Sequence, residues 1–168
     1  MNDTTDNATL EKTTPLLDMP TFLEAQRHER YRAFVVHGSP TQGKTAFARK
    51  LVELLGGAYV DVLETVAGSR ELSERVDTLS PNFLKEIALE RAKQGANLVM
   101  LDEFDFLLPI WGSEQSRLFE IVRKLSVTET QAVVGFVMQT TPVLESLTLQ
   151  NSAGQSRILR LDEIRGLK

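Results

Sequence analysis

Residues 38–45 are Gly-Ser-Pro-Thr-Gln-Gly-Lys-Thr, which match the pattern G-x-x-x-x-G-K-[ST] at every fixed position. A loop of this kind requires a buried strand before it and a helix after it, because the first N–H groups of the helix converge on a bound anion. The chain meets both requirements. Residues 33–37 form a short apolar run, and apolar residues recur at helical spacing over 44–55, before a pair of glycines. The sequence therefore predicts a strand, a phosphate-binding loop and a helix in succession.

Each residue type in this loop has a physical role. Glycine allows the backbone to approach phosphate closely, the amine of Lys44 reaches the β- and γ-phosphates, and the hydroxyl of Thr45 ligates Mg²⁺. We expect ATP and Mg²⁺ as the cofactors, since the chain has no Asn-Lys-x-Asp stretch that would recognise guanine. His37, directly before the loop, is interpreted as a strand-end residue. The predicted nucleotide-binding residues are Gly38, Ser39, Pro40, Thr41, Gln42, Gly43, Lys44, Thr45 and Ala46.

The rest of the chain alternates between apolar runs and amphipathic segments, which is typical of a parallel sheet covered by helices. The predicted strands are 33–37, 58–63, 97–101, 132–138 and 157–161, and the predicted helices are 21–32, 44–55, 81–94 and 113–126. Residues 64–80 are polar and are not assigned. The expected fold is α/β: a five-stranded, mainly parallel sheet with helices on both faces. This is the core of a P-loop NTPase, here without a helical lid domain.

The first 20 residues differ in composition from the rest of the chain. Residues 1–20 are rich in Thr, Asp, Asn and Pro, and we predict a flexible tail there. Residues 21–168 are predicted to form one domain, a size at which a single hydrophobic core suffices. Thr21 would cap its first helix, with Glu24 three residues later.

Composition and charge exclude several kinds of partner and chemistry. The chain contains no cysteine and two histidines, which excludes disulfides, thiolate catalysis and a histidine-rich metal site. The net charge of −4 gives no global positive field, so nucleic acid would be contacted only indirectly or through a local patch. No segment resembles a signal peptide or a membrane span. We therefore expect a cytoplasmic protein with no membrane partner.

A second acidic motif follows the phosphate-binding loop. Residues 98–101 are an apolar run that leads directly into Asp102 and Glu103, the form of a Walker B motif. Carboxylates at the carboxyl end of a parallel strand lie where ligands bind in such folds. Asp102 is predicted to hold Mg²⁺ through water, and Glu103 to orient and polarise the attacking water; the alternative is an ordinary acidic turn. Asp105 is interpreted as a solvated or helix-capping residue.

Further residues are candidates for contacts with the γ-phosphate. In P-loop proteins with a catalytic glutamate, an extra strand lies between the strands of the two motifs, and its polar tip senses the γ-phosphate. Gln139 is the first candidate for this role and Thr140 the second, with a plain strand end as the alternative.

An arginine beside the γ-phosphate accelerates hydrolysis strongly. Arg157, at the start of the fifth strand, matches its position in AAA+ proteins. Arg117 and Arg123 are further candidates, and a surface arginine is the alternative. The predicted catalytic set is Lys44, Glu103, Gln139, Thr140 and Arg157.

The apolar stretch 106–111 follows the second motif directly. Its composition is compatible with a partner-binding surface that responds to nucleotide. The sequence favours the alternative, in which these residues pack on the sheet.

Over residues 30–165 the chain resembles BrxF, the small P-loop ATPase family of BREX-type anti-phage defence systems. The segments that carry the resemblance are GSPTQGKT, YVDVLE, LVMLDEFDFLL, RLFEIVRKLS and VVGFVM, in this order. The resemblance implies a bacterial or archaeal cytoplasmic protein that binds ATP within a multi-protein complex. That complex would include a DNA methyltransferase, a PglZ-type phosphatase-like protein and a large ATPase. The chain has Asp-Glu at 102–103 where related chains have Asp-Asn, so hydrolysis would vary within the family.

The sequence thus predicts an Mg-dependent ATP-binding protein that acts as an ATPase in a bacterial phage-defence complex. One alternative is a nucleotide-dependent binding or scaffold module with little or no hydrolysis. A small-molecule kinase is a second alternative. The sequence is compatible with a homo-oligomer.

Overall fold

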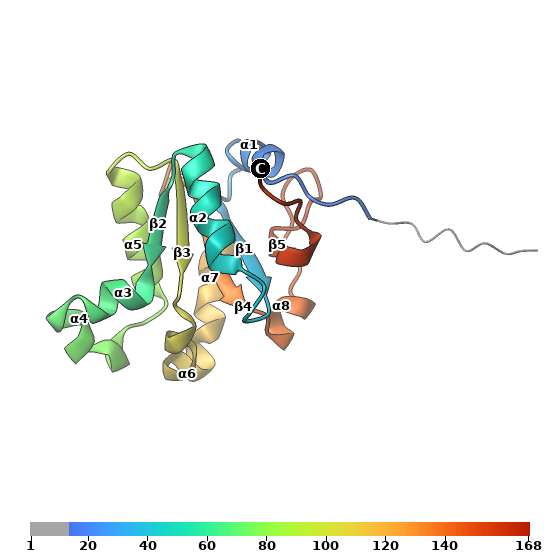
Figure 1. Cartoon of the computed structure of the whole chain (residues 1–168). Coiled ribbons are helices and arrows are strands. Elements are labelled where there is room, and N and C mark those ends of the chain that lie inside the picture. The colour runs from blue at the N-terminus through green and yellow to red at the C-terminus, as the bar shows by residue number, and fades with distance from the viewer. Residues whose placement is uncertain (1–13) are drawn as a thin grey trace, which may run out of the picture.

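The computed structural model describes residues 14–168, which form an α/β fold built on a five-stranded sheet. The strands are β1 (Ala33–Gly38), β2 (Ala58–Asp61), β3 (Leu98–Asp102), β4 (Val133–Gln139) and β5 (Ile158–Arg160). They lie in the order β2-β3-β4-β1-β5, and every neighbouring pair is parallel (Figure 1). The predicted α/β class with a five-stranded sheet is confirmed, and the sheet is wholly rather than mainly parallel. Strand β4 separates β1, which precedes the 38–45 loop, from β3, which ends at Asp102.

Helices connect the strands, since parallel neighbours require crossover connections. The α-helices are α1 (Met19–Gln26), α2 (Lys44–Leu55), α3 (Val62–Ala67), α4 (Arg70–Glu74), α5 (Asn82–Lys93), α6 (Leu108–Trp111), α7 (Gln115–Lys124) and α8 (Pro142–Ser146). Short 3₁₀ helices are η1 (Val76–Thr78), η2 (Asp105–Leu107), η3 (Gly112–Glu114) and η4 (Leu161–Glu163). None of the helices between residues 14 and 168 is long and apolar enough to cross a membrane.

Side chains along the strands alternate between two hydrophobic clusters, because successive residues of a strand point to opposite sides of the sheet. On β1, Ala33 and Val35 belong to the cluster that includes side chains of α5 and α7. Phe34 and Val36 belong to the cluster that includes side chains of α1 and α2. All four residues are fully buried, which explains why residues 33–36 are apolar without interruption. Burial on both sides fixes β1, and with it the start of the 38–45 loop.

Helix α2 has the predicted bounds, and a glycine precedes and follows it. Gly43, before its first residue, has a φ of 81°, and Gly56, after its last residue, has a φ of 70°. A residue with a Cβ is strained in this left-handed conformation, so glycine is required at both positions. The second glycine of the 38–45 motif is therefore dictated by the turn into the helix.

Helix α1 begins earlier than predicted. Its N-cap is Asp18, whose carboxylate accepts hydrogen bonds from the backbone N–H and the hydroxyl of Thr21. Thr21 therefore does not cap the helix but lies in its first turn, and the helix ends at Gln26. Met19 is fully buried and Leu17 forms a parallel bridge with Ile164, so this part of the predicted tail packs on the domain. Residues 1–13 of the predicted tail lie outside the described residues.

Strand β2 is shorter than predicted. The strand ends at Asp61, because the Asp61 side chain accepts the Glu64 N–H at 2.9 Å and so caps α3. The unassigned segment 64–80 contains the rest of α3, together with α4 and η1. The other predicted elements are present with bounds shifted by one or two residues. Capping by a single side chain outweighed the apolar run that predicted a longer strand.

Candidate functional site

The predicted site residues converge at the carboxyl edge of the sheet. The 38–45 loop leaves β1, Asp102 ends β3 and Gln139 ends β4, and the three strands are adjacent and parallel. They surround a cavity of about 170 Å³ lined by Pro40, Gly43, Lys44, Thr45, Asp102, Glu103, Asp105 and Gln139. Six of these eight were predicted from the two motifs, and Gln139 from the end of the fourth strand. The predicted loop residues Gly38, Ser39, Thr41, Gln42 and Ala46 do not line this cavity.

The amine of Lys44 is held over the loop by two neutral oxygens. Its Nζ donates to the Ser39 carbonyl oxygen at 2.7 Å and to Gln139 Oε1 at 3.2 Å. The residue is 6 % exposed. Within residues 14–168, no carboxylate lies within ion-pair distance of this amine. The positive charge is consequently free to compensate an anion that enters the cavity.

The two motifs meet through the hydroxyl of Thr45. Thr45 Oγ1 is 2.7 Å from Asp102 Oδ2 and 3.1 Å from Glu103 Oε1. Asp102 is 3 % exposed and accepts two further hydrogen bonds, from the Tyr59 hydroxyl at 2.9 Å and the Glu103 N–H at 2.8 Å. Burial, reinforced by the bond to Asp102, raises the pKa of the Tyr59 hydroxyl, which therefore remains the donor.

This donor set suits a hard cation that keeps most of its other ligands. No group of three or more His, Cys, Asp or Glu side chains that could hold a metal occurs in the described part of the chain. Mg²⁺ does not need such a cage, because it is commonly bound by one or two protein oxygens together with phosphate oxygens and water. The Thr45 hydroxyl and the Asp102 carboxylate, already in contact, are oxygens of this kind.

Glu103 has an unusual backbone conformation. Its φ of 58° makes it the one non-glycine residue with a positive φ between residues 14 and 168. The left-handed conformation costs about 1–2 kcal/mol for a residue with a Cβ. Strain of this kind persists where surrounding structure holds it, and it is concentrated at functional sites. Here it directs an exposed carboxylate to the rim of the cavity, 3.1 Å from Thr45.

Asp105 is a site residue that the sequence interpretation missed. It is half-buried, lines the cavity, and accepts the backbone N–H of Gln139 at 3.0 Å through Oδ1. Burial raises the pKa of this carboxyl group, and the hydrogen bond from Gln139 partly offsets the effect. Asp105 therefore does not cap a helix; its hydrogen bond connects the segment after β3 to the end of β4. Its closeness to Asp102 and Glu103 in sequence was the available signal.

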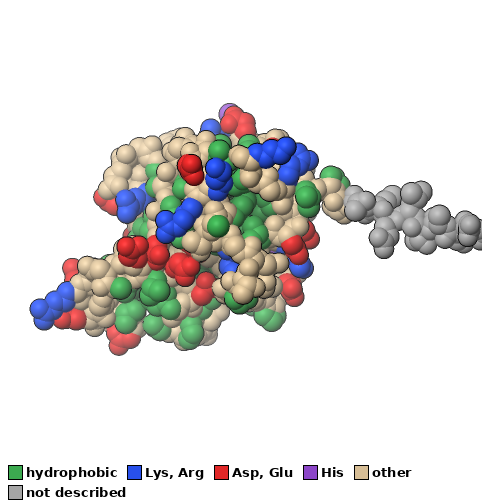
Figure 2. All heavy atoms as spheres, viewed as in Figure 1, with side chains coloured by type: hydrophobic (Ala, Val, Ile, Leu, Met, Phe, Trp, Pro, Cys, Tyr) green, Lys and Arg blue, Asp and Glu red, His purple; other side chains and the backbone are tan. Residues whose placement is uncertain are grey.

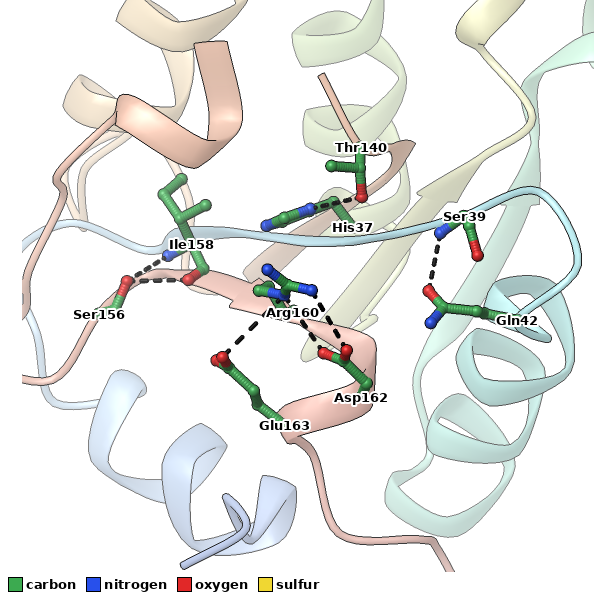
Figure 3. Close-up of polar contacts among 9 residues, drawn as sticks. All are labelled: His37, Ser39, Gln42, Thr140, Ser156, Ile158, Arg160, Asp162 and Glu163. Carbon is green, nitrogen blue, oxygen red and sulfur yellow. Dashed lines mark hydrogen bonds and ion pairs between the residues drawn. The ribbon is translucent and has the colours of Figure 1, made fainter. Parts of the chain in front are cut away.

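Gln139 and Thr140 point to different surroundings. Gln139 lines the cavity and contacts Lys44, whereas the Thr140 hydroxyl lies 2.9 Å from His37 Nδ1 (Figure 3). His37 is buried at the end of β1, as expected for a strand-end residue. Burial lowers its pKa, and the nearby charge of Arg160 adds to the effect. Of the two sensor candidates, Gln139 is the one in contact with the site.

The 38–45 loop is also closed by one of its own side chains. Gln42 Oε1 accepts the Ser39 N–H at 2.7 Å (Figure 3). The Gln42 N–H in turn donates to the Ser39 carbonyl at 3.2 Å. These contacts connect the two sides of the loop and hold its curvature. Gln42 thus supports the loop instead of lining the cavity.

The structure does not bring Arg157 to this site. Arg157 is 2 % exposed, and its guanidinium donates to the carbonyl oxygens of Ala33, Val122 and Arg123 at 3.2–3.4 Å. Ala33 begins β1, so these contacts lie at the edge of the sheet opposite the loop. Neither Arg117 nor Arg123 lines the cavity. Arg160 ends β5, where it pairs with Asp162 and Glu163 (Figure 3).

The stretch Phe106–Trp111 packs against the domain, as the sequence favoured. Leu107 is fully buried, and Trp111 is 4 % exposed with its Nε1 donating to the Leu79 carbonyl at 2.7 Å. Ile110 is exposed, so the stretch presents one large apolar side chain.

On the face drawn in Figure 2, acidic and basic side chains are interspersed, without a continuous basic area.

Comparison of the sequence with known proteins does not identify a family for this chain. No protein-family model matches the sequence, and a comparison with curated proteins gave no match.

Proposed function

We propose that this chain is a P-loop NTPase core, with helices on both faces of its sheet, that binds Mg-ATP in the 170 Å³ cavity and hydrolyses it. One observation carries the proposal: Lys44, Thr45, Asp102 and Glu103 meet around one cavity at the carboxyl edge of a parallel sheet. Ligands of doubly wound folds bind at this edge. The strand order, with β4 between β1 and β3, supports the same class.

Each of these residues has a role in this proposal that follows from its contacts. The Lys44 amine, which has no carboxylate partner among residues 14–168, neutralises phosphate oxygens. The N–H groups at the start of α2 donate to the same anion. Thr45 and Asp102 would hold Mg²⁺, which would supply further charge compensation at the phosphates. Glu103 orients a water molecule and accepts its proton, and Gln139 contacts the terminal phosphate through its amide.

A nucleotide-dependent binding module is the second candidate. Among the residues described, no arginine lines the cavity, and an arginine beside the γ-phosphate is worth about 10³–10⁵ in rate. Turnover by the isolated chain would then be slow unless a partner or a second copy supplies the guanidinium. Cytoplasmic action within a phage-defence complex remains part of the proposal, on the strength of the motif order shared with BrxF.

The test is equilibrium binding and hydrolysis of Mg-ATP by the purified chain and three variants. Lys44→Ala should weaken ATP binding about tenfold or more, because a charge-assisted contact to phosphate is lost. Lys50→Ala is the matched control, since Lys50 is on the same helix but pairs with Glu53 outside the cavity. Glu103→Gln should bind ATP and lose hydrolysis.

The outcomes separate the two candidates. If the unmodified chain does not bind ATP, or if Lys44→Ala and Lys50→Ala bind equally well, the nucleotide site is refuted. If ATP binds but the rate equals that of Glu103→Gln at every protein concentration, the chain is a binding module. A rate per molecule that rises with concentration indicates that a second copy completes the site.

A further inference from the structure

Tyr59 contacts the candidate metal site from outside its cavity. The Tyr59 hydroxyl donates to Asp102 Oδ2 at 2.9 Å, and the same oxygen accepts from Thr45 at 2.7 Å. Tyr59 is on β2 and does not line the 170 Å³ cavity. It lines instead a second cavity, together with Arg49, Asp61 and other residues, and Asp102 does not line that cavity. A ligand in the first cavity would therefore be affected by Tyr59 only through Asp102.

Arg49 holds the ring of Tyr59. The Arg49 guanidinium carbon is 4.1 Å from the centre of the Tyr59 ring, within the range of a cation–π contact. Arg49 lies on α2, one turn after Thr45, and α2 packs over β2 and β3 (Figure 1). The helix that supplies Thr45 thus also supplies the cation that restrains Tyr59. In the described chain, Arg49 has no carboxylate within 4.0 Å that would compete for its guanidinium.

Packing alone does not account for a tyrosine here. The ring is partly exposed at the second cavity, so a phenylalanine would fill the same space. What the hydroxyl adds is a third donor to a carboxylate that is 3 % exposed, beside Thr45 and the Glu103 N–H. Carboxylates that ligate metals are commonly oriented by such outer hydrogen bonds, and loss of one lowers metal affinity.

We infer that Tyr59, restrained by Arg49, is a positioning residue that orients Asp102 for Mg²⁺ and so sets the metal dependence of nucleotide binding. This inference rests on the proposed function. It assigns to Tyr59 no contact with nucleotide and no part in proton transfer. It predicts that the effect of Tyr59 appears in the Mg²⁺ requirement and is absent when Mg²⁺ is removed.

The experiment is a titration of MgCl₂ against the chain and a fluorescent ATP analogue, read by anisotropy, with a parallel measurement in EDTA. Tyr59→Phe should raise the half-saturating Mg²⁺ concentration about tenfold or more, because a hydrogen bond to an ionised carboxylate that would ligate the metal is lost. Binding in EDTA should stay unchanged. Arg49→Gln should cause a smaller rise, about twofold, since it removes only the contact with the ring. Tyr31→Phe is the matched control, because Tyr31 is the other tyrosine of the chain and contacts Arg30 and Arg157.

Failure of the inference and failure of the proposed function give different results. If the unmodified chain binds no ATP analogue, both fall. If it binds, Lys44→Ala weakens binding, and Tyr59→Phe matches Tyr31→Phe at every Mg²⁺ concentration, the inference alone is overturned. It is also overturned if Tyr59→Phe binds Mg²⁺ more tightly, or if it weakens binding equally in EDTA. Thermal unfolding of Tyr59→Phe, measured alongside, identifies a general loss of structure, which would appear in EDTA as well.

Discussion

Replacement of Arg157 by methionine should destabilise the fold without affecting the nucleotide site. Two of its three acceptors, the carbonyls of Val122 and Arg123, belong to the last turn of α7, where carbonyl groups lack helical partners. The third, on Ala33, belongs to β1. The guanidinium thus joins the end of α7 to the sheet. With contacts of 3.2–3.4 Å, each carbonyl loses about 1 kcal/mol, so Arg157→Met should cost about 3 kcal/mol.

The assay is thermal unfolding by circular dichroism, together with Mg-ATP binding at 20 °C. For a chain of this size, 3 kcal/mol corresponds to a fall in Tm of about 6–12 °C. Arg70→Met is the control, because Arg70 is exposed on α4 and pairs only with Glu74 there; its Tm should change by about 2 °C or less. A normal Tm for Arg157→Met would refute the reasoning. So would a loss of ATPase activity at unchanged Tm, which would restore Arg157 as a catalytic candidate.

Two further predictions concern backbone strain and pH. In chemical denaturation, the free energy of unfolding of Glu103→Gly should exceed that of Glu103→Gln by about 1 kcal/mol, because glycine adopts the left-handed conformation without strain. Both variants lack the carboxylate, so equal free energies of unfolding would contradict strain at this position. Burial holds the pKa of His37 below its usual 6.5, so the unfolded chain binds a proton at a higher pH than the folded chain does. The buried neutral His37 therefore contributes stability that is fully present above pH 6.5. This contribution is lost as pH falls towards the pKa of His37 in the folded chain. The drop in Tm between about pH 7.5 and 5.5 should therefore be smaller for His37→Gln than for His28→Gln, which replaces an exposed histidine and keeps His37. An equal drop in Tm for the two variants would contradict a buried neutral His37.

Much of the candidate site could be predicted from short stretches of sequence. The 38–45 loop needs only the strand before it and the helix after it, and both are encoded by neighbouring residues. Asp102 ends a buried strand and Glu103 follows it, and these positions are encoded locally in the same way. Gln139 was predicted by comparison with P-loop proteins that have a catalytic glutamate, in which the tip of the extra strand contacts the γ-phosphate; the pairing of β4 with β1 is not encoded locally.

Predictions were wrong where a single side chain changed a boundary or a role. Asp18 in place of Thr21 began α1, and Asp61 turned the end of β2 into a helix cap. Asp105 was interpreted as a solvated or capping residue, because its partner, the Gln139 N–H, is 34 positions away in the chain. Composition and periodicity contain no information about such a partner.

The sequence by itself determined the α/β class, the 38–45 loop with its helix, and the acidic residues that follow β3, because each depends on residues close together in the chain. Only the tertiary structure decided that Tyr59 contacts Asp102, that Asp105 contacts the end of β4, and that Arg157 is buried against α7. These contacts depend on strand order and on distances between segments far apart in sequence. A carboxylate or a guanidinium acquires its role from what folding places beside it, and that is fixed only when the sheet has formed.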